Sequence, residues 1–238
     1  MNITLHTGKT VATITTDGAY ITSLTDEHGD VFYPLQQLTT PDGERKTRGG
    51  CHVCLPNFGP GGASGLAQHG FGRTSQWRVV EQASDRVELM LQGGGAYAGL
   101  ESRLVYTVAE HQLAMQLRLA NVGEDELLVA PAFHPYFAYD GTLVLDGQSL
   151  TDLALLADTI FVDGPTRQLA TGRRTITLQS EGLPRWAVWT DELGPYLCVE
   201  PTHSGNSFAD NPARAAALAP GQTARYGVRV GWVTNPSI

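Results

Sequence analysis

Apolar and polar side chains alternate with a period of two along most of the chain. Between Leu113 and Leu119 every second side chain is apolar, and the side chains between them are largely polar. The same pattern recurs from Tyr226 to Trp232. Because successive side chains of a β-strand point to opposite faces, these segments are predicted to be strands with one buried face. Further strands are predicted at residues 86–91, 104–108, 175–178, 186–190 and 196–199.

Turn signals separate the predicted strands, among them the dipeptides Asp17-Gly18, Asp140-Gly141 and Asp146-Gly147. The 27 glycines and 13 prolines are spread along the chain, which fits many short strands joined by turns. Helical signals are few. Residues 213–218 are predicted to form a short helix capped by Asn211 with Pro212 in its first turn, and residues 152–157 a helical turn. We therefore expect an all-β fold, a large antiparallel β-sandwich formed by a single domain over residues 1–238.

Composition and charge narrow the classes of function. Hydrophobic residues make up 42% of the chain, enough for a full core. The formal net charge of −8 lacks the basic surface that a nonspecific nucleic-acid binder needs, so we expect no nucleic-acid partner. No apolar run approaches the roughly 18 residues that span a bilayer. No basic N-terminal stretch precedes an apolar run, so we expect no secretory signal, no membrane partner and a cytoplasmic location.

The chain has three cysteines, an odd number that argues against a disulfide framework. Cys51 and Cys54 form a C-x-x-C sequence around His52, which is compatible with a zinc or redox site. A structural zinc site needs about four ligands, and the chain has no second cysteine pair. The simpler interpretation is two small buried residues beside a loop, and we expect no bound metal.

Four segments interrupt the strand pattern and carry unusual residues. Their bounds are residues 48–60, 69–73, 131–137 and 200–207. The first is dense in glycine and proline, which predicts a shaped loop. The histidines of these segments are too far apart in sequence to show metal-ligand spacing, although folding could gather them, which leaves a metal-dependent β-sandwich enzyme as one hypothesis.

His134 and Glu200 are the candidate acid–base residues. His134 precedes a proline, so its backbone is extended, and aromatic residues flank it. Flanking aromatic side chains suit a sugar-binding site, because the C–H faces of a sugar pack on aromatic rings. Glu200 ends the apolar run 196–199, where a buried carboxylate is costly unless it is paired or used. From the residues alone, His134 could equally be a hydrogen-bonded histidine in an aromatic cluster, and Glu200 could point to water.

The four segments, in this order on an all-β chain, resemble the aldose 1-epimerase family, also called galactose mutarotase-like. The resemblance covers residues 48–232 and is closest to the glucose-6-phosphate 1-epimerase branch. It is carried by Arg48-Gly49-Gly50, Leu55-Pro56-Asn57-Phe58-Gly59-Pro60, His69-Gly70-Phe71-Gly72-Arg73, His134-Pro135-Tyr136-Phe137, Glu200-Pro201 and the segment from Leu218 to Gly221. Gly72 replaces the family's usual alanine, and Thr202-His203-Ser204 replaces an aromatic residue and a glycine, which leaves the choice of substrate open.

The resemblance implies an isomerase that needs no cofactor and no metal. Glu200 would take the proton of the anomeric hydroxyl, and His134 would protonate the ring oxygen, with its pKa raised by the nearby carboxylate. Substrate-binding roles would fall to Arg48, His69, Arg73 and Asp158. The partner would be a sugar or sugar phosphate, and the protein a monomer or small homo-oligomer. The alternative is a noncatalytic carbohydrate-binding protein on the same fold.

Overall fold

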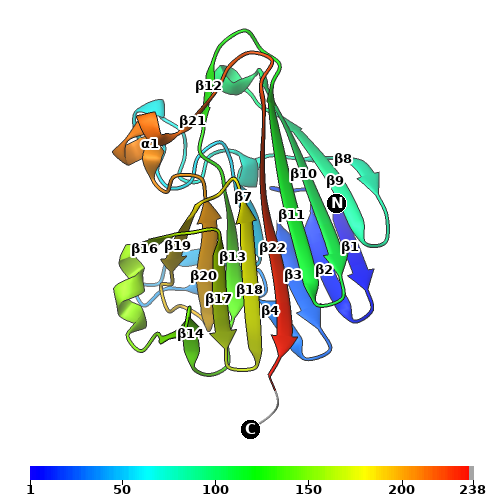
Figure 1. Cartoon of the computed structure of the whole chain (residues 1–238), viewed down its shortest axis with the longest axis vertical. Coiled ribbons are helices and arrows are strands. Elements are labelled where there is room, and N and C mark those ends of the chain that lie inside the picture. Colours follow the sequence, from blue (N-terminus) through cyan, green and yellow to red (C-terminus); the bar gives the residue numbers. More distant parts are fainter. Residues whose placement is uncertain (236–238) are drawn as a thin grey trace.

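The computed structural model describes residues 1–235 and consists of two nine-stranded antiparallel sheets packed face to face (Figure 1). This is the predicted all-β antiparallel sandwich. Each strand buries its apolar side chains against the facing sheet, as the period-two pattern requires. One hydrophobic core extends between the sheets.

The first sheet carries the candidate site. Its strands run in the order β1, β2, β3, β4, β13, β20, β19, β16, and β7 pairs with both β13 and β3. Their bounds are β1 Asn2–Thr7, β2 Thr10–Thr15, β3 Ile21–Asp26, β4 Gly29–Phe32, β7 Cys51–Cys54, β13 Ala132–Ala138, β16 Ile160–Asp163, β19 Arg185–Trp189 and β20 Tyr196–Thr202.

The second sheet covers the other side of the core. Its order is β15, β14, β17, β18, β22, β11, β10, β9, β8. The bounds are β8 Arg78–Gln82, β9 Arg86–Gln92, β10 Leu100–Ala109, β11 Gln112–Asn121, β14 Leu143–Leu145, β15 Gln148–Ser149, β17 Thr166–Thr171, β18 Arg174–Glu181 and β22 Thr223–Thr234. Burial alternates strictly along β10, and its neighbour β11 pairs with it from Leu100↔Asn121 to Ala109↔Gln112. The predicted strands of this sheet are confirmed.

Two ribbons and a few short helices complete the chain. The ribbons pair β5 (Gln36–Thr39) with β6 (Arg45–Arg48) and β12 (Leu127–Val129) with β21 (Ala216–Leu218). The helices are α1 Ser207–Asp210 and the 3-10 turns η1 Gly62–Ser64, η2 Gly72–Thr74, η3 Gly95–Tyr97, η4 Leu153–Asp158 and η5 Pro212–Arg214. Over the described residues, none of these helices has the length and apolar character needed to cross a membrane.

The prediction of a helical turn at 152–157 is confirmed by η4, but the helix predicted at 213–218 is wrong. Pro212 does open a single 3-10 turn that follows Asn211, yet the Asn211 side chain makes no capping hydrogen bond. The chain then extends into β21, where Leu218 pairs with Leu127. A tertiary strand pairing therefore outweighs the local helical preference of the alanines.

The expected loop character of residues 48–60 is also wrong in part, because residues 51–54 form the buried strand β7. Likewise, residues 132–137 lie in β13, and residues 200–202 form the end of β20. These strands do not alternate between buried and exposed, because one face packs on the core and the other lies beneath loops. Their second face builds the candidate site.

Candidate active site

Three neighbouring strands place the candidate residues in one row across the first sheet. On β7 the side chains of Cys51 and Val53 face the main core, and on β13 and β20 every second side chain does the same. His52, His134 and Glu200 occupy the alternate positions of these strands, so they face the other way. His134 is paired directly with His52 of β7. On the other side, β13 and β20 pair at Ala132↔Thr202 and Tyr136↔Cys198, which puts His134 opposite Glu200. Side chains directly opposite each other on antiparallel strands are in contact.

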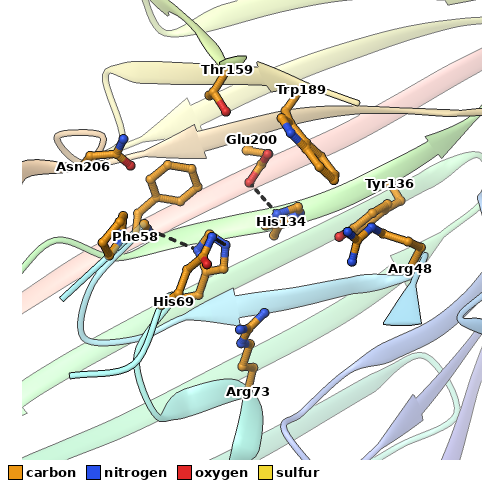
Figure 2. A pocket seen from close by; sticks show the side chains of 13 residues that line it. Arg48, Phe58, His69, Arg73, His134, Tyr136, Thr159, Trp189, Glu200 and Asn206 are labelled. Carbon is orange, nitrogen blue, oxygen red and sulfur yellow. Dashed lines mark hydrogen bonds and ion pairs between the residues drawn. The ribbon is translucent and has the colours of Figure 1, made fainter. Parts of the chain in front are cut away.

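The central pair of the site is His134 and Glu200. The Nε2 atom of His134 lies 3.2 Å from Oε2 of Glu200 (Figure 2). The residues are 5% and 1% exposed. Within the described chain, neither Oε2 of Glu200 nor Nδ1 of His134 forms a hydrogen bond. Oε2 of Glu200 therefore keeps unused acceptor capacity, and Nδ1 of His134 has no partner that orients the ring.

Burial favours the uncharged form of both members of the pair. It raises the pKa of Glu200 well above its usual 4.5. It also lowers the pKa of His134 well below 6.5, and the neighbouring His52 and His69 lower it further. The expectation of a raised His134 pKa is therefore wrong, because the cost of burying the imidazolium dominates. Burial thus disfavours the charged form of each group.

His69 stands beside this pair as a neutral hydrogen-bond donor. Its Nδ1 accepts a hydrogen bond of 3.2 Å from the amide of Gly59. Since Nδ1 accepts, the proton of the neutral ring is on Nε2. Burial, and then the charge of Arg73, lowers the pKa of His69 to about 3. The ring therefore stays uncharged at neutral pH and offers Nε2–H.

Arg48 reaches the site from a tight turn between β6 and β7. A Cβ on Gly49 would lie 2.2 Å from the carbonyl oxygen of Pro34, so only glycine fits this close approach. The guanidinium of Arg48 donates to Asp191 Oδ2 through Nε at 2.8 Å, and its Nη2 lies 2.7 Å from the same oxygen. Asp191 also accepts a hydrogen bond from Tyr196. The charge of Arg48 is thus balanced inside the protein.

A cavity of about 410 Å³, a size typical of small-molecule sites, is lined by Arg48, His69, His134 and Glu200. Figure 2 shows the aromatic rings of Tyr136 and Trp189 on one side of it and Phe58 on another. Arg73 also lines the cavity, and it takes part in none of the ion pairs found among residues 1–235. Arg73 is therefore the cation whose charge is open to a ligand.

Five of the six residues predicted for the site line this one cavity, namely Arg48, His69, Arg73, His134 and Glu200. Asp158 does not, because it ends η4 with an exposed side chain. Its neighbour Thr159 lines the cavity instead, with a φ of 42°. A β-branched residue rarely adopts this left-handed conformation, so the turn holds Thr159 in place at some cost in strain.

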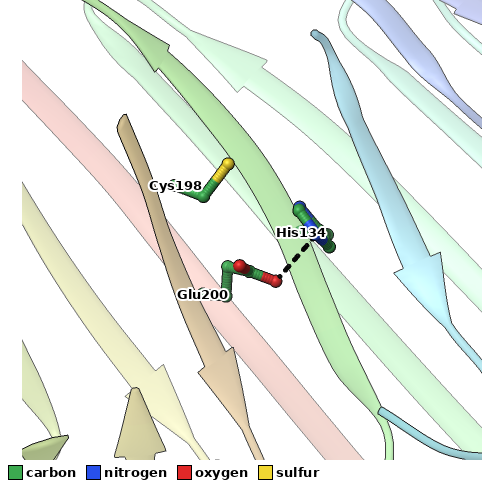
Figure 3. Close-up of side chains that lie close together, drawn as sticks. All are labelled: His134, Cys198 and Glu200. Carbon is green, nitrogen blue, oxygen red and sulfur yellow. Dashed lines mark ion pairs between the residues drawn. The ribbon is translucent and has the colours of Figure 1, made fainter. Parts of the chain in front are cut away.

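Among residues 1–235, two groups of side chains could hold a metal ion. His134, Cys198 and Glu200 offer one ligand atom each, all within 4.8 Å of one another (Figure 3). An ion bound there would use both His134 and Glu200 as ligands. The second group is Asp26, Glu27 and His111, far from the cavity. Cys51 and Cys54 lie on opposite faces of β7, since three positions separate them along a strand, so they cannot share an ion.

Sequence reasoning missed three features of this site. It placed His52 in the C-x-x-C sequence and among four histidines that folding could gather, but gave it no role at the site. Folding gathers His52, His69 and His134 and leaves His203 against Tyr226. It also gave no role to Trp189 or to Asp191, which is 143 positions from Arg48. No local pattern marks a residue whose partner lies so far along the chain.

The chain and its fold are similar to known proteins. Residues 1–175 match the family model for aldose 1-epimerase. The structure superposes on the Slr1438 protein from Synechocystis sp. PCC 6803 with a TM-score of 0.80 at 20% identity, covering 99% of this chain and 96% of that chain. A galactose mutarotase related enzyme from Lactobacillus acidophilus gives 0.79 at 16% identity, with 100% and 99% covered.

A galactose mutarotase-like protein from Lactobacillus casei ATCC 334 also gives a TM-score of 0.79, at 17% identity, with 98% of this chain and 100% of that chain covered. A comparison with curated proteins gives no match. At these identities the solved structures establish the fold, which is galactose mutarotase-like.

Proposed function

The chain belongs to the aldose 1-epimerase family, and on that premise we propose that it is a mutarotase. It interconverts the α and β anomers of an aldohexose or of a hexose 6-phosphate by opening and closing the sugar ring. The observation that carries the proposal is the buried contact of 3.2 Å between His134 Nε2 and Glu200 Oε2 in the wall of the cavity. Such a pair can take one proton and give another at neighbouring atoms of one substrate.

The reaction needs a proton removed from the anomeric hydroxyl and a proton delivered to the ring oxygen. Both oxygens are bonded to C1, so two groups in contact with each other can reach them together. Glu200 takes the hydroxyl proton and His134 protonates the ring oxygen. The aldehyde then rotates about C1–C2, and closure on the other face returns both protons and inverts the anomeric centre.

The proton balance of the pair fits this cycle. Burial favours the uncharged form of the pair, a carboxylic acid beside a neutral imidazole. Moving the proton from Glu200 to His134 creates no net charge. Sugar hydroxyls donate hydrogen bonds to the carboxylate, so substrate binding favours the carboxylate–imidazolium form that the reaction uses.

The rest of the cavity is suited to a sugar ring. Tyr136 and Trp189 provide apolar faces for C–H groups, while the Nε2–H of neutral His69 donates to an oxygen. Because Arg48 is paired with Asp191, recognition of a 6-phosphate depends on Arg73. The place of the chain in the glucose-6-phosphate 1-epimerase branch is part of the proposal.

The test compares mutarotation of galactose, glucose and glucose 6-phosphate by polarimetry or exchange NMR. We expect Glu200→Gln and His134→Asn each to lower the rate about 10²–10⁴-fold, the usual contribution of one acid or base group. The matched control is Glu81→Gln, an exposed carboxylate on the edge strand β8, which should keep the wild-type rate. Unchanged rates in both site variants would refute the acid–base assignment.

The alternative of a noncatalytic carbohydrate-binding protein is an outcome of the same experiment. Sugar binding by calorimetry together with mutarotation no faster than the uncatalysed rate would replace the enzyme proposal by that alternative.

A further inference from the structure

His52 lies in a stack of four aromatic side chains that has His134 near its centre. The ring centroids of His52 and His134 are 4.7 Å apart with planes at 24°. Tyr20 covers the other side of His52 at 4.8 Å and 36°. Tyr136 covers the other side of His134 at 4.9 Å and 15°. The His134 ring is therefore held between two rings that are almost parallel to it.

The nitrogen atoms of His52 take no part in hydrogen bonding within the described chain. Both Nδ1 and Nε2 are buried without a partner, and the residue is 2% exposed. A buried histidine normally satisfies at least one nitrogen. The contacts that His52 does make are made by the faces and edge of its ring, toward Tyr20, His134 and His69.

His134 lacks the contact that usually orients a catalytic histidine. In most sites the nitrogen away from the reacting atoms donates to a carboxylate or carbonyl, which fixes the ring. Nδ1 of His134 has no such partner among residues 1–235. With no partner on Nδ1, the orientation of the ring depends on the Nε2 contact with Glu200 and on the packing of the rings around it.

We propose that His52 is a positioning residue for His134, holding the catalytic ring by stacking in the plane from which Nε2 faces Glu200. The inference rests on the proposed function, in which that plane determines whether the proton reaches the sugar oxygen. It follows from the strand register, since His52 and His134 are directly opposed on β7 and β13. His52 and His134 are far apart in the sequence, so their pairing cannot be read from sequence spacing.

The charge state of His52 is compatible with this role. Burial lowers its pKa well below 6.5, and the neighbouring His69 and Arg73 lower it further. A neutral ring can stack on His134 while His134 becomes an imidazolium during the reaction, whereas a charged ring at 4.7 Å would repel it. Tyr136 on the opposite side is a favourable neighbour for the imidazolium.

The experiment compares His52→Ala, which removes the ring, with His52→Phe, which keeps a ring but no nitrogen. We expect His52→Ala to lower kcat about 10–100-fold, the usual cost of losing a residue that orients a catalytic group. KM should change by less than about twofold, because His52 does not line the cavity. His52→Phe should restore most of the lost kcat.

The matched control is Cys51→Ala on the same strand, whose side chain faces the main core instead of the stack. It should leave kcat unchanged, although it trims a buried side chain. A wild-type kcat in His52→Ala would overturn the proposal, as would a His52→Phe variant no better than His52→Ala. An equal loss in Cys51→Ala would also overturn it by showing that any change in β7 has the same effect.

A second measurement separates this proposal from the proposed function. Imidazole 15N NMR of His134 should show one tautomer in the wild type and in His52→Phe, and averaged or broadened signals in His52→Ala. His134 signals that are the same in all three proteins would overturn the positioning role. If the wild type has no mutarotase activity, the proposed function fails, and the NMR comparison still decides whether His52 orients His134.

Discussion

A buried ion pair joins the two sheets of the sandwich at the end of β3. The carboxylate of Asp26 accepts hydrogen bonds from the guanidinium of Arg174 on β18, from Trp232 Nε1 at 2.8 Å and from the amide of His28 at 2.8 Å. Arg174 also donates to the carbonyl oxygens of Gly29 and Asp30. Both side chains are almost completely buried. The perturbation with the clearest expected effect is therefore Asp26→Asn.

The substitution removes one charge and leaves the other buried. Breaking a buried pair from one side costs about 3–5 kcal/mol, because Arg174 keeps a charge that nothing balances. A domain of this size loses about 2–4 °C of Tm per kcal/mol. Asp26→Asn should therefore lower Tm by about 6–20 °C. Replacing both partners by apolar residues, in Asp26→Leu with Arg174→Met, should cost much less.

The adjacent pair of Arg173 and Asp140 provides the control, because its side chains are 52% and 43% exposed. Asp140→Asn should cost about 0–1 kcal/mol, as exposed ion pairs do. Thermal unfolding followed by circular dichroism would compare the variants at equal protein concentration. If Asp26→Asn lost no more stability than Asp140→Asn, burial would not be what makes the Asp26 pair important, and the reasoning would be refuted.

Three further predictions concern the pH dependence of the Asp26 ion pair and the roles of Thr159 and Arg73 in the cavity. Burial alone would raise the pKa of Asp26, but hydrogen bonds, chiefly the one from Arg174, hold that pKa below its usual 3.8. The extra stability of the wild type over Asp26→Asn should therefore be complete at neutral pH and shrink as the pH falls below 3.8. Unfolding at stepped pH would measure this difference, and a difference that grew in acid would contradict the prediction. Asp158→Ala should leave mutarotation kinetics unchanged, while Thr159→Ala should raise KM roughly fivefold through loss of one hydroxyl contact. The same KM in both variants would argue against a contact between Thr159 and the sugar. Arg73→Ala should lower kcat/KM for glucose 6-phosphate about 10–100-fold more than for glucose, and equal losses on both sugars would exclude a phosphate role.

Much of the fold follows from local pattern. Strands that are buried on one face and exposed on the other, such as β10 and β11, show their period in the sequence, and they were predicted as strands for that reason. Turn dipeptides and the scarcity of helical signals determined the all-β class. Site candidates such as His134 and Glu200 were found from their residue type, their proline neighbours and the family resemblance.

The centre of the site was beyond local pattern. β7, β13 and β20 are buried on both faces, so they lack the alternation that signals a strand. The apolar run 196–199 still predicts part of β20, whereas the glycines and prolines around residues 51–54 predict a loop where β7 forms. The stacking of His52 on His134 depends on a register between strands about 80 positions apart in the chain, which sequence spacing does not encode.

The sequence by itself determined the class of fold, the likeness to the family and most of the residues around the cavity. Tertiary structure decided how those residues work. Burial reversed the expected direction of the His134 pKa, and Asp191 balanced the charge of Arg48 from 143 positions away. The end of η4 brought Thr159 to the cavity in place of Asp158. Each of these depends on desolvation or on a long-range contact, and neither exists until the sheets have packed.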